Sequence, residues 1–465
     1  MTQRIESDYL VTGAGGMGMA FVDEILTQTD ATVTIVDRKH RPGGHWNDAY
    51  PHVRLHQPSA CYGVNSTPLG KERVDEVGLN KGCYELASGS EVVAYFDTVM
   101  RDRFLPSGRV TFLPATDYKG DRRAVSRSCG TEYEFAVKKI VDATYLNVTV
   151  PSQRPPKFGV EGGAVAVPPN ELPRALTPGQ HFVIVGSGKT GIDACLFLLT
   201  MGVPVERITW IMPNDAWLFD RFTVNLGRKF TDICIATQIG VLNEALAATS
   251  VDDYFQRLLA AGHVMAFDPA VKPTRWRCAT VTPMELEQIR KIKNVVRMGH
   301  VESVAPGVIR LEKGVHRVPE SSVFIDCAAD GLTKVPAKKV FDGTHITLQS
   351  VRMCQQVYSA GFIANVEINV PGEARKNELC RPVPHPYLAR DYLRCAIQNS
   401  ENMLTWLTEP AVVKWINESR IDLFSPYLYF DDPQCAAGIE AMCGLIKQAV
   451  PKLQQLLEDD ELIAA

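Results

Sequence analysis

The hydrophobic pattern near the N-terminus predicts a strand, a helix and a second strand. An apolar run at Tyr9–Thr12 ends in a group of glycines, apolar residues recur through Met19–Leu26, and a second apolar run, Ala31–Val36, ends in Asp37. A glycine-rich turn between a strand and a helix, with an acidic residue after the next strand, is typical of a dinucleotide-binding unit.

The glycines of this turn follow the spacing Gly13-x-Gly15-x-x-Gly18. The first glycine permits a tight turn, the second lets the backbone approach a pyrophosphate, and the third lets the helix pack against the strand. Amide groups at the helix N-terminus would face the phosphates, and the carboxylate of Asp37 would accept a hydrogen bond from a ribose hydroxyl. We therefore predict that this unit binds a dinucleotide.

The same pattern recurs farther along the chain. An apolar run at His181–Val185 leads into Gly186-x-Gly188-x-x-Gly191, and apolar residues then recur at helical spacing. The strand expected next, Arg207–Met212, ends without a carboxylate, unlike its counterpart in the first copy.

Each copy also has a later apolar strand that ends in an aspartate, at Asp142 in the first copy and at Asp326 in the second. Two similar copies in one chain predict an α/β fold with two Rossmann-type units, each closed by a last parallel strand.

Composition changes this picture little. The chain has 465 residues, 45% hydrophobic and 22% charged, and its formal net charge is −4. These values are typical of a globular protein with two or three domains, and the absence of excess positive charge argues against a nucleic-acid partner. No apolar stretch is long enough for a membrane span, and the polar N-terminus leaves no room for a signal peptide. We expect a cytoplasmic protein.

Two dinucleotide units in a chain of this length are characteristic of flavoproteins that take hydride from a nicotinamide. The most specific segments follow the first unit's acidic residue, at Arg41–Trp46, Tyr50–Ser59 and Tyr62–Ser66. On these residues the chain resembles the superfamily of flavin-containing and Baeyer–Villiger monooxygenases, over roughly residues 8 to 365. The resemblance implies an FAD domain with an inserted NAD(P)-binding domain and a helical C-terminal region.

The domains expected from this resemblance are the first part of an FAD-binding domain at 1–155, an NAD(P)-binding domain at 156–335, and a return to the FAD domain with a helical C-terminal region at 336–465. Short strands at Val110–Leu113 and Tyr133–Val137 would form the β-insertion of the flavin domain. Apolar series near the C-terminus are assigned to the core, with a contact in a homo-oligomer as the alternative.

In this superfamily a Gly-Gly-x-Trp turn follows the ribose acid, and a segment similar to Arg-Leu-His-x-Pro-Ser runs past the flavin. The resemblance implies that the two glycine turns and these segments bind the cofactors. The expected FAD residues are Gly13, Gly15, Gly16, Met17, Gly18, Asp37, Arg38, Gly43, Gly44, His45, Trp46, Arg54, His56 and Gln57. The expected residues for NADP or NAD are Gly186, Gly188, Lys189, Thr190 and Gly191.

The catalytic candidates are Asn65, His56 and Ser59. Asn65 stands where flavin-containing monooxygenases carry an asparagine near the reactive C4a carbon. His45 and His56 could each shuttle a proton, because the unperturbed pKa of histidine lies near neutrality. A structural hydrogen bond to the cofactor phosphates or to the loop backbone is the alternative for both histidines.

The sequence also departs from the superfamily. The Baeyer–Villiger fingerprint before the second glycine turn is missing, and the usual Ala-Thr-Gly triplets read Ala143-Thr144-Tyr145 and Ala328-Ala329-Asp330-Gly331. The second strand of the nicotinamide unit is followed by neither an acid nor an arginine, so the choice between NADH and NADPH stays open. Candidate partners for a 2′-phosphate, with ordinary surface charge as the alternative, are Lys189, Arg221, Arg228 and Lys229.

Twelve cysteines are scattered without a Cys-x-x-Cys pair, so we expect reduced thiols and no metal site. Disulfide reductases with two dinucleotide units carry a Cys-x4-Cys pair soon after the first fold. Here Cys61 stands alone and Cys83 is the next cysteine. A dithiol relay to the flavin is therefore not expected.

Three functions are compatible with these observations. The first is an FAD-dependent, NAD(P)H-using monooxygenase that oxygenates a small organic substrate with molecular oxygen through a flavin C4a-(hydro)peroxide. The second is an FAD-dependent oxidase or dehydrogenase in which the nicotinamide site has weakened. The third is a non-catalytic nucleotide-binding flavoprotein. Flavin and nicotinamide would carry the redox chemistry in the first two, while the protein positions them.

Overall fold

The computed structural model describes residues 2–146, 148–225, 227, 229–328, 334–422 and 433–464. The first glycine turn belongs to a mixed sheet of eight strands: β1 (Thr2–Thr12), β2 (Val33–Val36), β3 (Val110–Leu113), β4 (Thr116–Gly120), β5 (Arg123–Ser126), β6 (Glu132–Asp142), β18 (Phe341–Asp342) and β19 (His345–Thr347). The main strand order is β18-β19-β6-β1-β2-β3, in which all neighbours from β19 to β3 are parallel.

The second glycine turn belongs to an all-parallel sheet of five strands: β8 (Val165–Val167), β9 (Phe182–Val185), β10 (Ile208–Ile211), β13 (Val295–Val296) and β17 (Val323–Asp326). Its order, β13-β10-β9-β17-β8, repeats the order β3-β2-β1-β6-β19 of the first sheet. In both sheets the central strand precedes the glycine turn, and its neighbour ends in the predicted aspartate. The prediction of two Rossmann-type units is confirmed.

Two small sheets accompany the second unit. One contains β7 (Gly159–Val160), β14 (Val301–Ala305), β15 (Val308–Leu311) and β16 (Gly314–Arg317), and the other pairs β11 (Ala216–Asp220) with β12 (Arg275–Val281) in parallel.

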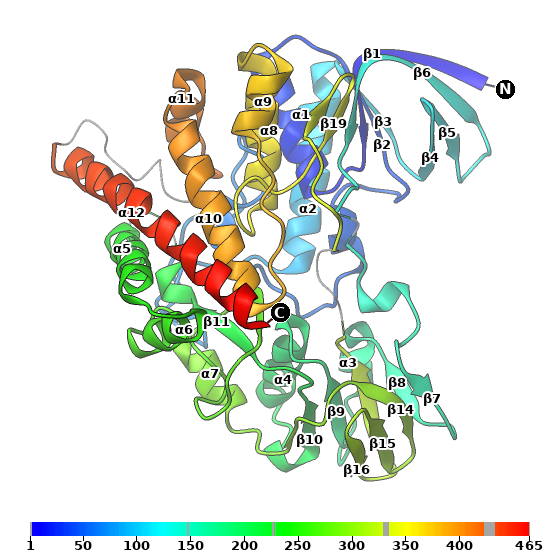
Figure 1. Ribbon diagram of the computed structural model, residues 1–465. Coiled ribbons are helices and arrows are strands. Elements are labelled where there is room, and N and C mark those ends of the chain that lie inside the picture. Colours follow the sequence, from blue (N-terminus) through cyan, green and yellow to red (C-terminus); the bar gives the residue numbers. More distant parts are fainter. Residues whose placement is uncertain are drawn as a thin grey trace.

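The helices, short 3₁₀ and π turns apart, are α1 (Gly16–Gln28), α2 (Gly89–Val99), α3 (Leu172–Ala175), α4 (Lys189–Thr200), α5 (Thr231–Ala247), α6 (Val251–Ala260), α7 (Pro283–Ile289), α8 (Gln356–Asn369), α9 (Glu373–Leu379), α10 (Ala389–Trp406), α11 (Pro410–Glu418) and α12 (Pro433–Ala464). Figure 1 shows the first sheet at the upper right, the second at the lower right, and helices α5, α6, α10 and α12 along the left side.

The predicted β-insertion is corrected by the strand pairing. Val110–Leu113 is strand β3, which pairs in parallel with β2 in the main sheet, and Tyr133–Val137 lies inside β6. The antiparallel strands are instead β4 and β5, which join the first half of β6. A short alternating strand has the same local pattern in either setting, because its partners are distant in sequence. The sequence pattern therefore did not reveal the antiparallel pairing of β4 with β5.

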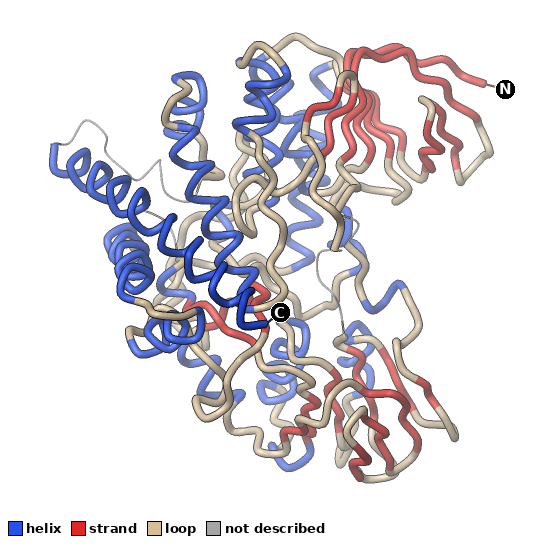
Figure 2. The backbone as a smooth tube through the Cα atoms, viewed as in Figure 1, coloured by secondary structure: helices blue, strands red, loops and turns tan. Residues whose placement is uncertain are grey.

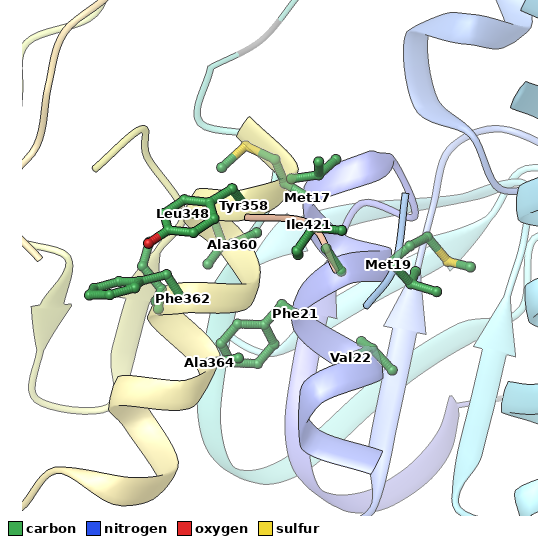
Figure 3. Packing of buried hydrophobic residues seen from close by; sticks show 14 of the residues in the cluster. Met17, Met19, Phe21, Val22, Leu348, Tyr358, Ala360, Phe362, Ala364 and Ile421 are labelled. Carbon is green, nitrogen blue, oxygen red and sulfur yellow. The ribbon is translucent and has the colours of Figure 1, made fainter. Parts of the chain in front are cut away.

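After the second unit the chain returns to the first sheet, as predicted. Strand β19 pairs with β6, and α8 packs lengthwise against α1 (Figure 3). In Figure 3, Phe21 of α1 lies toward Ala360 and Ala364 of α8. Met19 and Val22 point away from α8, and Tyr358 and Phe362 point away from α1, yet all seven residues belong to one buried apolar cluster. Burying these side chains stabilises the helix that carries the first glycine turn, at about 25 cal/mol per Å² of apolar surface.

The C-terminal part is helical over its described residues, as expected (Figure 2). Helix α12 packs against α5 and α10, and buried residues of α6, α10, α12 and β12 share one apolar cluster. Through this cluster the segment between β10 and β13, which contains α6 and β12, packs against the C-terminal helices α10 and α12. Among the described residues, no helix combines the length and the apolar character needed to cross a membrane.

Candidate functional site

The third glycine of each turn is required by close packing. A Cβ atom on Gly18 would lie 2.0 Å from the carbonyl oxygen of Gly13, and one on Gly191 would lie 2.1 Å from that of Gly186. Real Cβ atoms do not approach an oxygen so closely, so any side chain would separate helix from turn. The predicted role of the third glycine is confirmed in both copies.

The first glycine of each turn adopts a backbone conformation that other residues rarely adopt. The φ angle is +101° at Gly13 and +119° at Gly186. An added Cβ would meet the end of the neighbouring strand in both cases, at Thr144 in the first unit and at Cys327 in the second. These local constraints hold the N-termini of α1 and α4 in the same relation to their sheets.

Both glycine turns line one cavity of about 1310 Å³. The predicted cofactor residues that line it are Gly13, Gly15, Gly16, Met17, Asp37, Arg38, Gly44, His45, Trp46, Arg54, His56, Gln57, Gly188, Lys189 and Thr190. The lining does not include Gly18, Gly43, Gly186, Gly191 or the catalytic candidates Asn65 and Ser59. Two helix N-termini that meet one cavity offer two places for phosphate groups.

Asp37 connects the glycine turn to the end of β2. Its carboxylate accepts hydrogen bonds from the backbone N–H groups of Ala14 at 2.6 Å and Lys39 at 2.7 Å, and burial raises its pKa. The side chain is buried and lines the cavity, so one carboxylate both fixes the turn and lies where a ribose hydroxyl could reach it. Its role in ribose binding stays a prediction.

The Gly-Gly-His-Trp segment packs directly on the first glycine turn. Gly44 has φ +55°, and a Cβ there would lie 2.9 Å from the Cα of Gly15, so two backbones meet without side chains. The indole N–H of Trp46 donates to the hydroxyl of Tyr62 at 2.7 Å, and the imidazole of His45 stacks on the indole. Burial lowers the pKa of His45 to about 4, so its ring is neutral at pH 7.

Tyr50 links the two units across the cavity. Its phenol donates to a carboxylate oxygen of Asp193 on α4 at 2.7 Å, and the other oxygen pairs with Lys189. Burial, with the nearby carboxylate, raises the pKa of Tyr50 well above its usual range, so the phenol keeps its proton. Lys189, predicted to bind a phosphate, is thus already engaged in an ion pair.

The segment expected beside the isoalloxazine ring lies along the cavity wall. Arg54 donates to the carbonyl of Leu86 at 2.9 Å, and the amide of Gln57 donates to the carbonyl of Cys61 at 3.1 Å. Burial lowers the pKa of His56 to about 3, while a hydrogen bond to the backbone of Cys278 acts in the opposite direction. A proton shuttle needs a pKa near the operating pH, so this ring is neutral but a weak base, and its part in proton transfer stays a prediction.

Asn65 and Ser59 have protein partners outside the cavity. The amide of Asn65 donates to Glu24 on α1 at 2.9 Å. The hydroxyl of Ser59 donates to the carbonyl of Glu85 at 2.9 Å and accepts from the N–H of Ala87 at 2.7 Å. These contacts show structural roles, and a part in catalysis stays a prediction.

The candidate phosphate partners have different environments. Arg221 is buried, pairs with Glu285 at 2.9 Å and donates to Asn80 at 3.0 Å, so it is neither a surface charge nor directed at the cavity. Lys229 lies over the ring of Phe230. Arg228 and the residues Ala329, Asp330 and Gly331 lie outside the described residues. Tyr145, the third residue of the first altered triplet, donates to the carbonyl of Pro336 at 2.6 Å.

Sequence reasoning missed a wall of the cavity formed by segments far apart in the chain. It includes Arg277 and Cys278 of β12 and His385 before α10, of which Cys278 and His385 meet Cys354 of the loop before α8. Cys278 and Cys354 form a disulfide, so the expectation of reduced thiols is wrong for this pair. Among the described residues, only this pair with His385 forms a group whose sulfur and nitrogen atoms all lie close enough to share a metal ion. No spacing in the sequence signals these contacts.

Acidification is expected to destabilise the protein through its buried imidazoles. Burial lowers the pKa of His45, His52 and His385 to about 4 and of His56 to about 3, below the ordinary 6.5. Below pH 6.5 the unfolded chain therefore takes up protons that the folded chain does not, so stability falls until about pH 4. At pH 5 we expect a loss of about 1 kcal/mol for each histidine after allowing for partial exposure.

The measurement is urea unfolding at pH 7 and pH 5 for the wild-type chain, His56→Gln and the exposed-site control His345→Gln. The His56→Gln variant should lose less stability on acidification than the other two proteins. Equal losses in all three would contradict the assignment of His56 as a neutral buried ring.

No family model matches the chain. Similar solved structures include a flavin-containing monooxygenase from Stenotrophomonas maltophilia, 14% identical over 78% of this chain and 97% of that one, with a TM-score of 0.46. They also include a steroid monooxygenase, 13% identical over 96% of this chain and 98% of that one, with a TM-score of 0.46. The resemblance expected from the sequence is to this same group of proteins.

Much closer relatives occur in mycobacteria. Uncharacterized proteins of Mycobacterium tuberculosis (strain H37Rv) and Mycobacterium bovis are both 48% identical to this chain over 425 residues, which is 91% of this chain and 79% of each relative. Identity of this extent over most of both chains shows common descent and a common fold, and the chain belongs to the same family as these mycobacterial proteins.

Proposed function

We propose that the protein is an FAD-dependent monooxygenase that takes hydride from NADPH or NADH and oxygenates a small organic substrate. The observation that carries this proposal is the single cavity lined by both glycine turns. A hydride donor and a hydride acceptor must approach closely, and two dinucleotide sites that open into one space allow this.

The first turn is the better fit for FAD. It has the buried carboxylate of Asp37 beside it, and the Gly-Gly-His-Trp segment that accompanies FAD in the resembling superfamily packs against Gly15. The second turn would hold the nicotinamide nucleotide. FAD and the nicotinamide supply hydride transfer and oxygen activation when bound. The division into domains at 155 and 335 stays part of this proposal.

The protein's own contribution would be orientation, exclusion of water and proton transfer. The cavity wall is rich in apolar and aromatic side chains, which favour an apolar substrate and keep the reacting atoms away from water. His56 is our candidate for proton transfer because it lines the cavity and lies in the segment expected beside the isoalloxazine. This role requires that the bound cofactors raise its pKa from about 3 toward neutrality.

One observation favours the second candidate, an FAD-dependent oxidase or dehydrogenase. Lys189, the only cation predicted within the second turn, is paired with Asp193, and Met212-Pro213-Asn214 offers no arginine after β10. In that case the organic substrate, rather than a nicotinamide, would deliver the hydride.

The test compares cofactor consumption with hydrogen peroxide formation. FAD-loaded protein is mixed in air with NADPH or NADH and with an amine, a thioether or a ketone. A monooxygenase places one oxygen atom in its substrate, so peroxide should fall below the amount of NAD(P)H consumed when a suitable substrate is present. Peroxide formed from an organic substrate without NAD(P)H would instead establish the oxidase, and no reaction under any condition would favour a non-catalytic flavoprotein.

Removal of the Asp37 carboxylate should weaken FAD binding. Because a hydrogen bond to a charged group contributes about 1.5–3 kcal/mol, Asp37→Ala should raise the dissociation constant for FAD by about tenfold or more. The measurement is FAD fluorescence quenching, with the exposed carboxylate variant Asp102→Asn as control. Equal FAD affinity in the two variants would count against ribose binding by Asp37.

A further inference from the structure

The disulfide between Cys278 and Cys354 lies in the same cavity as the two glycine turns. Cys278 belongs to β12 and Cys354 to the loop before α8, 76 residues later in the chain. The fold therefore brings these sulfurs together, although no sequence motif does. Both side chains are half-buried, so a small molecule in the cavity can reach the pair.

The backbone presents both cysteines in a costly conformation. Cys278 has φ +52° and Cys354 has φ +58°, angles that few non-glycine residues adopt. Strained conformations of this kind cluster at functional sites, where the surrounding structure maintains them.

A β-bulge directs Cys278 out of its strand. Between β11 and β12 the pairing passes from Trp217–Trp276 to Phe219–Thr280, so the segment that contains Cys278 is longer than the segment opposite it. Bulges often re-aim a side chain beside an active site. Here the bulged residue lines the cavity and holds the ring of His56 through its backbone.

A hydrogen-bond acceptor lies beside the second sulfur. The Nδ1 atom of His385 is 3.7 Å from the Sγ of Cys354, and burial near Arg277 lowers the pKa of this histidine to about 4. A neutral imidazole at this distance can accept a hydrogen bond from a Cys354 thiol, and its low pKa leaves the proton on the sulfur. Metal ions bind cysteine as the thiolate, and two sulfurs joined in a disulfide are not thiolates. The disulfide therefore favours redox chemistry over metal binding.

We propose that Cys278 and Cys354 form a redox-active pair that receives electrons from the nicotinamide through the flavin and reduces small organic disulfides. This proposal rests on the proposed binding of FAD and a nicotinamide. In the first step the Cys278–Cys354 bond breaks, the two sulfurs gain two electrons and two protons, and one NAD(P)H is oxidised to NAD(P)⁺ with uptake of one further proton from solvent.

In the second step the dithiol reacts by thiol–disulfide exchange. One sulfur of the pair attacks the small disulfide and releases its first thiol, and the other sulfur then attacks the mixed disulfide and releases the second. The Cys278–Cys354 bond forms again, and the two protons leave on the two product thiols. A small disulfide is the fitting substrate because the pair lies inside a cavity.

The test follows the two cysteines by alkylation and peptide mass analysis. In air-oxidised, FAD-loaded protein the Cys278 and Cys354 peptides should be linked. After one equivalent of NADPH or NADH without oxygen, both cysteines should be alkylated while the flavin returns to its oxidised spectrum. Exposed Cys129 is alkylated in both samples and serves as an internal control.

Turnover is measured with 5,5′-dithiobis(2-nitrobenzoate) as the small disulfide. Cys278→Ser and Cys354→Ser should each reduce turnover by about tenfold or more, because exchange needs both sulfurs, whereas Cys129→Ser should match the wild type. The nicotinamide should still bleach the flavin in all three variants, and this bleaching would show that each variant is folded and has FAD bound.

The proposal is overturned if the nicotinamide bleaches the flavin but the Cys278 and Cys354 peptides stay linked. It is also overturned if both cysteines are alkylated in the air-oxidised protein, or if Cys278 and Cys354 bind one equivalent of a metal ion. Absence of bleaching by either nucleotide would be a failure of the proposed function instead. In that case light and EDTA can reduce the bound flavin, and release of the linked peptides would still support the pair as a redox centre.

Discussion

Replacement of Gly191 by alanine is expected to lower the free energy of unfolding by at least about 2 kcal/mol. The new methyl group would lie 2.1 Å from the carbonyl oxygen of Gly186 and 3.1 Å from its carbon, so α4 and the turn could not keep their contact. Urea unfolding monitored by tryptophan fluorescence measures this loss, and a nucleotide titration should show that the second site is lost with it.

Gly188→Ala is the matched control for the same turn. No atom lies within 4 Å of a Cβ built at Gly188, and its φ of −78° suits any residue, so the free energy of unfolding should change by less than about 0.5 kcal/mol. Gly188 lines the cavity, so the methyl group should still weaken nucleotide binding. A Gly191→Ala variant as stable as Gly188→Ala would contradict the packing described for the turn.

Replacement of Arg352 by methionine is expected to destabilise the fold by about 3–5 kcal/mol, because it removes the cation beside a buried carboxylate. Arg352 is 5% exposed and Asp422 is 0% exposed, and their charged atoms lie 2.9 Å apart. The guanidinium also lies 4.0 Å from the ring of Tyr358 on α8. This ion pair joins the loop before α8, which lines the cavity, to the segment that follows α11.

The denaturation midpoint in urea measures this effect. Arg101→Met, which removes an exposed ion pair with Asp102, should leave the midpoint unchanged. The double variant Arg352→Met with Asp422→Leu should recover part of the loss, because no uncompensated charge then stays buried. A wild-type midpoint for Arg352→Met would show that the pair does not hold the loop.

The features that the sequence predicted are those in which the local chain determines the geometry. The contacts of Gly18 and Gly191 involve residues only five positions away, and the strand, turn and helix around each are continuous in sequence. The parallel strands that end in Asp142 and Asp326 could be recognised because two copies gave the same pattern.

The features that were missed depend on contacts between distant segments. The pairing of β3 with β2, the ion pair of Arg221 with Glu285 and the bond between Cys278 and Cys354 each join residues that no local pattern relates. The cavity wall that contains Arg277, Cys278 and His385 belongs to this class, and in the proposed function it would contact the substrate. The sequence therefore allowed cofactor residues to be predicted, whereas it offered no pattern for the residues that would contact a substrate.

In the proposed function the two glycine turns hold a hydride acceptor and a hydride donor in one cavity. The most direct test mixes FAD-loaded protein with NADPH or NADH in the absence of oxygen and follows the flavin absorbance in a stopped-flow instrument. We expect rapid bleaching of the flavin by at least one nucleotide, and much slower bleaching in Gly188→Ala. A flavin that neither nucleotide bleaches would contradict the claim.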